Sequence, residues 1–194
     1  MAKILKNMFS LEGIDGSGKT TQIPLIREYL ERVGFLVRIF KNPSTSVLGE
    51  FIRKNVRSFN PWLRNKLFIL DMQAILIDQG ENPDPNIVLL WDRYIDSFYT
   101  SNPEMTIEEA NKLVFEMPTP IKTFWLDIKP AIVLKNRSET TNEHSDPKWL
   151  SLKQQRYNEL LRKNPKRIVR INGQQPIESV TKQIAEEIVK TMRI

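Results

Sequence analysis

One eight-residue segment near the N-terminus constrains the fold of this chain more than any other feature. It matches the pattern G-x-x-x-x-G-K-[ST] and reads Gly13-Ile14-Asp15-Gly16-Ser17-Gly18-Lys19-Thr20. The apolar run at 8–11 predicts a strand before it, and apolar residues at near-helical spacing over 21–30 predict a helix after it. A glycine loop between a strand and a helix directs backbone N–H groups and a helix N-terminus toward one point, which favours binding of phosphate oxygens.

The residue types in this loop predict separate roles in binding a nucleoside triphosphate such as ATP. Lys19 is expected to reach the β- and γ-phosphates, and the Thr20 hydroxyl is expected to bind Mg²⁺. The competing interpretation is a glycine turn beside an incidental lysine, and the flanking strand and helix patterns weigh against it. The expected ATP-binding residues are Gly13, Ile14, Asp15, Gly16, Ser17, Gly18, Lys19, Thr20 and Thr21.

Length and composition predict one globular domain, residues 1–194, with a sizeable core. The chain has no cysteine, which excludes disulfides and Cys-ligated metals, and its single histidine argues against a histidine-based metal site, so an oxygen-bound metal such as Mg²⁺ is favoured. No apolar run approaches the roughly 18 residues that a membrane-spanning helix needs, and the N-terminus shows no signal peptide. A cytoplasmic protein without a membrane partner is expected.

The formal net charge of +6 comes mainly from a basic segment at 147–171, where eight lysines and arginines accompany a single glutamate. Three interpretations are open: a solvated basic face, a field that attracts nucleotide polyanions, and a nucleic-acid patch. We favour the first and expect no nucleic-acid partner.

Strand and helix patterns alternate along the whole chain. Strands are predicted at 8–11, 35–40, 87–91, 122–126 and 167–171, and helices at 19–33, 48–55, 61–79, 106–116, 130–137, 147–163 and 176–192. Such alternation predicts an α/β fold, with a parallel five-stranded sheet covered by helices on both faces. Ligands of such sheets bind beyond the carboxyl ends of the strands.

Charged residues follow three of the predicted strands and are expected to converge on one crevice: Asp15, the pair Asp92-Arg93, and Asp127. Asp92 has the position of an acid that binds Mg²⁺, directly or through water, although it could instead cap the next turn. Arg93 could hold a substrate phosphate through two hydrogen bonds, or it could form an ion pair with a neighbouring carboxylate.

The predicted helix at 61–79 is apolar around more of its circumference than a surface helix requires. One stripe, assigned to the core, consists of Leu63, Leu67, Leu70, Ala74 and Ile77. A second stripe consists of Phe68, Met72 and Ile75. This second stripe either adds to the core or lines a pocket in which an aromatic ring stacks on a base.

Several motifs together resemble the thymidylate kinase family of P-loop nucleoside monophosphate kinases. They are the segments 11–22, 48–53 (Leu-Gly-Glu-Phe-Ile-Arg), 67–68 (Leu-Phe), 92–97 (Asp-Arg-Tyr-Ile-Asp-Ser) and 125–127 (Trp-Leu-Asp). The resemblance spans most of the chain. It implies a P-loop NTPase three-layer sandwich with a small lid, which here would be the polar stretch at about 138–146.

The resemblance also implies roles for individual residues. Asp15 would accept a hydrogen bond from the sugar 3′-hydroxyl of the acceptor nucleotide, Phe68 would stack on the base, and Arg93 would hold the acceptor phosphate. Arg53 and Met72 fall at further substrate-binding positions. The P-loop lacks an arginine, so Arg137 at the start of the lid is the expected catalytic arginine. A homodimer is left open, with the helix at 61–79 as a candidate contact.

Three departures from the family pattern concern the acceptor. The family often has Arg-Glu-Pro-Gly-Gly-Thr after the second strand, where this chain has Lys-Asn-Pro-Ser-Thr-Ser at 41–46. Met72 stands where an arginine commonly reads the pyrimidine, and Thr-Ser-Asn at 100–102 stands in place of Ala-Tyr-Gln. Because methionine donates no hydrogen bond, the base specificity is left open.

The expected function is ATP-dependent phosphoryl transfer to a deoxynucleoside monophosphate, above all dTMP, with Lys19, Asp92, Arg93 and Arg137 as catalytic residues. The alternatives are a kinase for another (deoxy)nucleoside monophosphate or for a nucleoside, a nucleic-acid-stimulated P-loop ATPase, and a phosphate-binding regulatory domain without catalysis.

Overall fold

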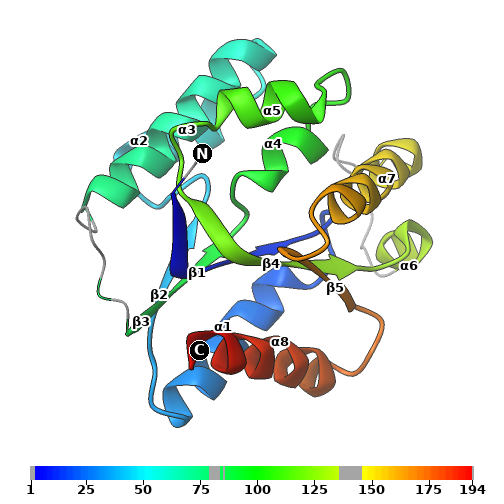
Figure 1. Ribbon diagram of the computed structural model, residues 1–194. Coiled ribbons are helices and arrows are strands. Elements are labelled where there is room, and N and C mark those ends of the chain that lie inside the picture. The colour runs from blue at the N-terminus through cyan, green and yellow to red at the C-terminus, as the bar shows by residue number, and fades with distance from the viewer. Residues whose placement is uncertain (1–2, 79–83, 85, 136–145, 194) are drawn as a thin grey trace.

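A five-stranded sheet between two layers of helices forms the body of the protein (Figure 1). The computed structural model describes residues 3–78, 84, 86–135 and 146–193. The strands are β1 (Ile4–Glu12), β2 (Leu36–Lys41), β3 (Ile87–Asp92), β4 (Thr119–Asp127) and β5 (Ile168–Asn172). The helices are α1 (Lys19–Arg32), α2 (Val47–Asn55), α3 (Pro61–Asp78), α4 (Asp96–Thr100), α5 (Ile107–Leu113), α6 (Pro130–Lys135), α7 (Pro147–Lys163) and α8 (Ile177–Met192).

All strand pairs are parallel, and the strand order is β2-β3-β1-β4-β5. The predicted α/β class and parallel five-stranded sheet are therefore confirmed. The sequence patterns missed the short helix α4 and predicted β1 and β4 too short, because Lys6 and Asn7 interrupt the apolar run of β1 and β4 begins with Thr119 and Pro120. Strands β1 and β3 end side by side at the same edge of the sheet, with Leu11 paired to Asp92.

The two faces of the sheet are covered by different helices (Figure 1). Because side chains alternate along a strand, Phe9 and Leu11 join the core under α1 and α8, whereas Met8 joins the core under α3 and α4. In β3, Leu90 likewise packs toward α1 and α8 and Trp91 toward α3. Near-continuous apolar strands are the pattern of a parallel sheet buried on both faces.

The orientation of α3 corrects the core stripe that periodicity predicted. Ile69 and Met72 are the buried apolar residues of this helix, whereas Leu70 is 51% and Ile77 is 80% exposed. Both stripes are apolar, so periodicity alone could not choose between them. Asp71, which is fully buried, fixes the rotation of the helix through hydrogen bonds to another segment. Neither α3 nor any other helix of the described residues is long and apolar enough to cross a membrane.

The segment between β2 and α2 is tied to α3 through Asp71. The Asp71 carboxylate accepts hydrogen bonds from the Ser44 backbone N–H and from the Ser44 hydroxyl, both at 2.6 Å. Helix α2 packs so closely on this segment that a Cβ added at Gly49 would lie 2.1 Å from the Ser44 carbonyl oxygen. These contacts hold the β2–α2 connection against one wall of the cavity described below.

Candidate active site

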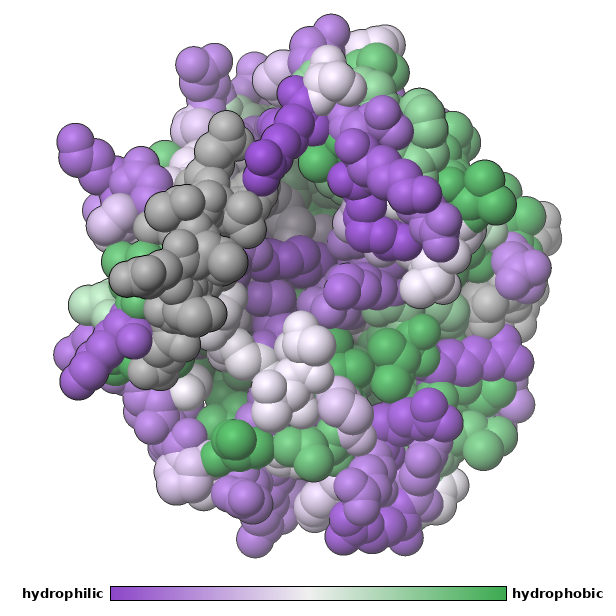
Figure 2. Space-filling view, turned by 180° about the vertical axis from the view of Figure 1, so that it is seen from behind, coloured by the Kyte–Doolittle hydropathy of each residue, from purple (hydrophilic) through white to green (hydrophobic). Residues whose placement is uncertain are grey.

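A cavity of about 790 Å³ opens at the carboxyl ends of the strands, between the glycine loop, the ends of β2 and β3, and helices α3, α4 and α7. Figure 2 shows a hollow in which hydrophilic side chains gather. Among its described lining residues, six cations face three carboxylates: Lys19, Lys41, Arg53, Arg64, Arg93 and Lys153 against Asp15, Asp92 and Asp146. An excess of cations in a concave site attracts polyanions such as nucleotides.

The glycine loop between β1 and α1 holds Lys19 over its own oxygen atoms. The Lys19 Nζ donates to the carbonyls of Gly13 and Ile14 at 3.1 and 3.0 Å and to the Ser17 hydroxyl at 3.2 Å. Burial, together with the charge of Arg93, lowers the pKa of Lys19 to about 7. A phosphate would give this ammonium a stronger partner than neutral oxygens do, because charge-assisted hydrogen bonds are the stronger kind.

The loop requires glycine at its first position. Gly13 has φ 152°, and a Cβ at this position would lie 2.6 Å from the Ser17 hydroxyl and 2.9 Å from the Leu126 carbonyl oxygen. The tight loop therefore follows from the absence of a side chain at Gly13.

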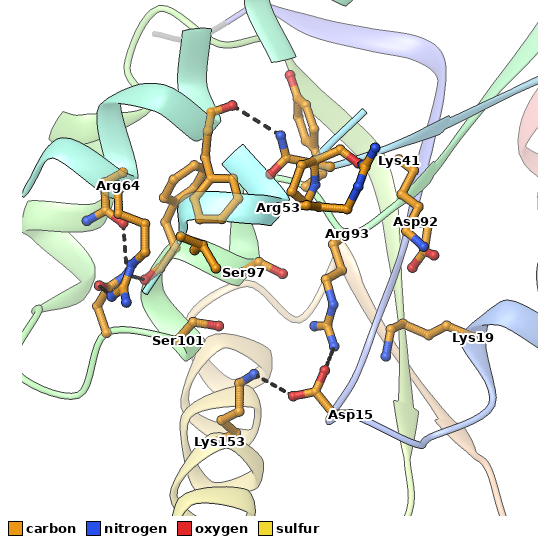
Figure 3. A pocket seen from close by; sticks show the side chains of 18 of the residues that line it. Asp15, Lys19, Lys41, Arg53, Arg64, Asp92, Arg93, Ser97, Ser101 and Lys153 are labelled. Carbon is orange, nitrogen blue, oxygen red and sulfur yellow. Dashed lines mark hydrogen bonds and ion pairs between the residues drawn. The ribbon is translucent and has the colours of Figure 1, made fainter. Parts of the chain in front are cut away.

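Asp15 links two cations at the centre of the cavity (Figure 3). Its Oδ1 accepts from Arg93 Nη2 at 2.6 Å, and its Oδ2 accepts from Lys153 Nζ at 3.3 Å. Arg93 has φ 66°, an uncommon left-handed conformation for a residue with a long side chain. Its Nη1 also donates to the Gly13 carbonyl at 3.0 Å, so Arg93 binds the glycine loop and the cavity carboxylate together.

Glu12, which ends β1, is a buried junction beneath the cavity. Its carboxylate accepts from the Tyr94 backbone N–H at 2.7 Å, the Ser97 hydroxyl at 2.7 Å and the Tyr157 hydroxyl at 2.9 Å. The Tyr157 hydroxyl in turn accepts from the Gly13 N–H at 3.1 Å. Glu12 therefore joins the glycine loop, the segment after β3 and α7. Burial raises the pKa of Glu12.

The residues predicted to bind Mg²⁺ line the same cavity as Lys19. Thr20 follows Lys19 in the first turn of α1, and the largely buried carboxylate of Asp92 ends β3. Within the described ranges, no cluster of three or more His, Cys, Asp or Glu side chains could hold a metal ion. One hydroxyl and one carboxylate nevertheless fit Mg²⁺, because this ion keeps waters and takes further ligands from substrate phosphates.

The opposite end of the cavity is aromatic and amide-rich. Phe68 and Phe98 line it with their rings 6.5 Å apart, and Arg64 donates to the Asn102 side-chain oxygen at 3.4 Å. Arg53 also lines the cavity and donates to the carbonyls of Pro43 and Ser44. An aromatic ring beside hydrogen-bonding groups suits a nucleotide base.

Outside the glycine loop and the start of α1, two of the described residues that were predicted at the site, Met72 and Asp127, do not line the cavity. Met72 is fully buried in the core under the sheet and does not line the cavity. Asp127 was expected to converge on the crevice, but it lies outside the cavity lining and accepts from Arg170 and Gln154. Asp127 ends β4, which lies on the other side of β1 from β3, and β4 and β5 extend the sheet away from the crevice. Arg137 and residues 138–145 of the predicted lid lie outside the described residues, whereas Asp146 lines the cavity.

The basic segment of α7 and β5 is less solvated than the sequence indicated. Lys153 lines the cavity, and the largely buried Arg156 donates to the Tyr99 carbonyl at 2.8 Å. Arg167 and Arg170 form ion pairs with Asp96 and Asp127. A helical projection of α7 could have given a signal, since Lys153 shares a face with the apolar Leu150, Tyr157 and Leu160.

Comparison with known proteins agrees with this architecture. A sequence model of the family described as "Thymidylate kinase" matches residues 11–184. The thymidylate kinase of Thermoanaerobacter sp. (strain X514) is 31% identical over 93% of this chain and 96% of its own length. That of Mycoplasma capricolum subsp. capricolum is 29% identical over 95% of both chains. A probable thymidylate kinase of Methanosphaera stadtmanae is 31% identical over 95% of this chain and 98% of its own. The chain therefore belongs to the thymidylate kinase family.

Proposed function

We propose that the protein transfers the γ-phosphoryl group of ATP to dTMP and releases ADP and dTDP. The observation that carries this proposal is a single cavity with two anion-binding parts. Lys19 and the glycine loop form one part, and the cations Arg93 and Lys153 form the other beside Asp15. Beyond them lies an aromatic end that includes Phe68. We take dTMP as the acceptor because the relatives are named thymidylate kinases.

In this proposal, the reaction depends on charge neutralisation and placement. Lys19 and the loop N–H groups hold the donor phosphates, and Arg93 holds the acceptor phosphate with its planar guanidinium. Mg²⁺, held by Thr20 and Asp92, would neutralise charge on the donor phosphates. The acceptor phosphate is already an anionic nucleophile, so no general base is needed. From sequence alone, Arg137 is assigned to the transferred phosphoryl group.

The acceptor nucleoside would extend from Arg93 toward the aromatic end of the cavity. We assign Asp15 to the sugar 3′-hydroxyl and Phe68 to stacking on the base. Arg53 shapes this part through its hydrogen bonds to the Pro43 and Ser44 carbonyls. Because Met72 is enclosed in the core, it is removed from the base-reading residues. We assign base recognition instead to the amide of Asn102 and the guanidinium of Arg64, two polar groups that line the aromatic end of the cavity.

The direct test is ADP formation from ATP and Mg²⁺ across a panel of deoxy- and ribonucleoside monophosphates, with thymidine as an unphosphorylated acceptor. We expect dTMP to raise ADP formation by at least about 10³-fold over ATP alone, because the arranged acceptor phosphate replaces a poorly held water. ATP turnover that no monophosphate changes would overturn the proposal. Faster turnover with thymidine than with dTMP would assign the cavity to a nucleoside kinase.

We also propose that residues 1–194 form a single kinase domain with its lid at about 138–146, and that it acts in the cytoplasm, where ATP is abundant. The apolar stripe exposed on α3, namely Leu63, Leu70 and Ile77, is assigned to contact with a second copy of the chain.

Sedimentation tests the homodimer. The wild-type protein should sediment as a dimer at micromolar concentration, and Leu70→Glu should sediment as a monomer, because a charge buried in an apolar interface lacks a partner. Glu186→Gln, an exposed change on α8, serves as the control that stays dimeric. A monomeric wild-type protein at the same concentration would rule this interface out.

A further inference from the structure

Lys153 is a buried lysine that the fold of α7 does not require. Its side chain is 4% exposed, lines the cavity, and places Nζ 3.3 Å from Asp15 Oδ2 and 5.6 Å from the centre of the Trp149 ring. The other buried residues of the same helix are Leu150, Arg156, Tyr157 and Leu160, and the Arg156 guanidinium donates to the backbone carbonyls of Tyr99 and Pro103. Because removing an ammonium from water is costly, an apolar side chain of similar length would serve packing better.

The carboxylate that Lys153 contacts already has a closer cation. Arg93 Nη2 lies 2.6 Å from Asp15 Oδ1, and the two side chains are 20% and 28% exposed. Figure 3 shows Arg93 and Lys153 pointing at Asp15 from different elements, one from the end of β3 and one from α7. Neutralising Asp15 therefore does not by itself explain the second cation.

Lys153, the second cation at Asp15, becomes necessary once an acceptor phosphate binds. A phosphate dianion competes with Asp15 for Arg93, since both offer paired oxygens to one guanidinium. If Arg93 turns toward the phosphate, Asp15 loses its shorter ion pair while the dianion brings further negative charge nearby. Without another cation, Asp15 would then hold Arg93 back or would be repelled from its place.

We propose that Lys153 is a positioning residue that holds Asp15 in place as a hydrogen-bond acceptor for the acceptor sugar while Arg93 binds the acceptor phosphate. This inference rests on the proposed function and adds a residue to its acceptor site. Lys153 acts through Asp15, so it should affect binding of the acceptor and leave the donor site unchanged.

The burial of Lys153 has an electrostatic consequence that agrees with this geometry. Burial and the neighbouring Arg93 charge lower the pKa of Lys153, and the charge of Asp15 opposes this change. The carboxylate that Lys153 positions therefore favours the charged form of this lysine.

Steady-state kinetics of Lys153→Met, Lys153→Arg and the matched control Lys163→Met test the inference. Lys163 lies on the same helix but is exposed. In Lys153→Met we expect the KM for dTMP to rise about tenfold, the loss of one charge-assisted contact, while the KM for ATP changes less than about twofold. In Lys153→Arg, at least half of the rise in the logarithm of the KM for dTMP should disappear. Lys163→Met should match wild type.

Two further readouts separate positioning from packing. The wild type should prefer dTMP to its 3′-deoxy analogue, and this preference should fall at least fivefold in Lys153→Met. In a double-mutant cycle with Asp15→Asn, the two substitutions should be strongly non-additive, because each removes the same arrangement. A purely packing role would lower thermal stability without changing either the preference or the coupling.

These measurements distinguish a failure of the role assigned to Lys153 from a failure of the proposed function. A wild-type enzyme that does not phosphorylate dTMP would remove the proposed function and the inference with it. An active wild type whose Lys153→Met variant keeps its KM for dTMP and its preference for the 3′-hydroxyl, or whose cycle is additive, would overturn the inference alone. If Lys153→Met does not fold, Lys153→Gln carries the same measurements.

Discussion

Replacing Arg93 by alanine is expected to lower dTMP-dependent turnover by a factor on the order of 10³ while leaving ATP affinity nearly unchanged. The guanidinium lies between the glycine loop and the acceptor part of the cavity, and it donates hydrogen bonds to the Gly13 carbonyl and to the Asp15 carboxylate. In the proposed mechanism, removing it would leave the acceptor phosphate without a planar, two-pronged partner, and lysine offers no such geometry. The donor phosphates would keep Lys19 and the loop N–H groups.

The measurement compares kcat/KM for dTMP with ATP affinity from calorimetry for Arg93→Ala and Arg93→Lys. Arg162→Ala, an exposed arginine of α7, is the control that should behave as wild type. Equal losses of ATP binding and turnover would assign Arg93 to the donor site. Unchanged turnover would remove it from the reaction.

Replacing Glu12 by alanine is expected to have the largest effect on stability, a loss of about 3–5 kcal/mol in the free energy of unfolding. The carboxylate accepts hydrogen bonds from Tyr94, Ser97 and Tyr157, and alanine would leave these buried donors without an acceptor. Denaturant unfolding monitored by circular dichroism measures the change. A loss below about 1 kcal/mol would show that water or rearrangement satisfies these donors.

Glu12→Gln separates the charge of Glu12 from its hydrogen bonds and gives a test in pH. Because the pKa of Glu12 is raised from 4.5 on folding, the native state holds this proton more tightly than the unfolded state. The part of the stability that comes from this proton is thus greatest below pH 4.5 and is lost as pH rises through the folded pKa. The stability of wild type relative to Glu12→Gln should therefore fall with rising pH across this window. A stability difference between wild type and Glu12→Gln that instead grows with pH would show that folding lowers the pKa of Glu12.

The fold was predictable because its determinants are local. The glycine loop has a sequence pattern with a direct geometric meaning, and the continuous apolar run of β3 is typical of a strand buried on both sides. The position of Asp15, Asp92 and Arg93 around one crevice followed from the rule that parallel strands present their carboxyl ends at one edge.

The rest depended on contacts between distant segments. The rotation of α3 is set by Asp71 and Ser44, which are 27 positions apart, so two apolar stripes of equal quality were ranked in the wrong order. Lys153 and Asp15 are 138 positions apart, so the apolar face of α7 could have indicated that Lys153 is buried, but no local pattern pairs it with Asp15. The role of Glu12 depends on distant contacts of the same kind, since its partners come from the segment after β3 and from α7.

Transfer of a phosphoryl group between two nucleotides bound in one cavity is the central feature of the proposed function. Incubation with ATP labelled in its γ-phosphoryl group and with dTMP, followed by separation of the products, tests this claim most directly. We expect one labelled dTDP for each ADP, with the label on the terminal phosphate and little inorganic phosphate. Release of the label as inorganic phosphate at a rate independent of dTMP would contradict it.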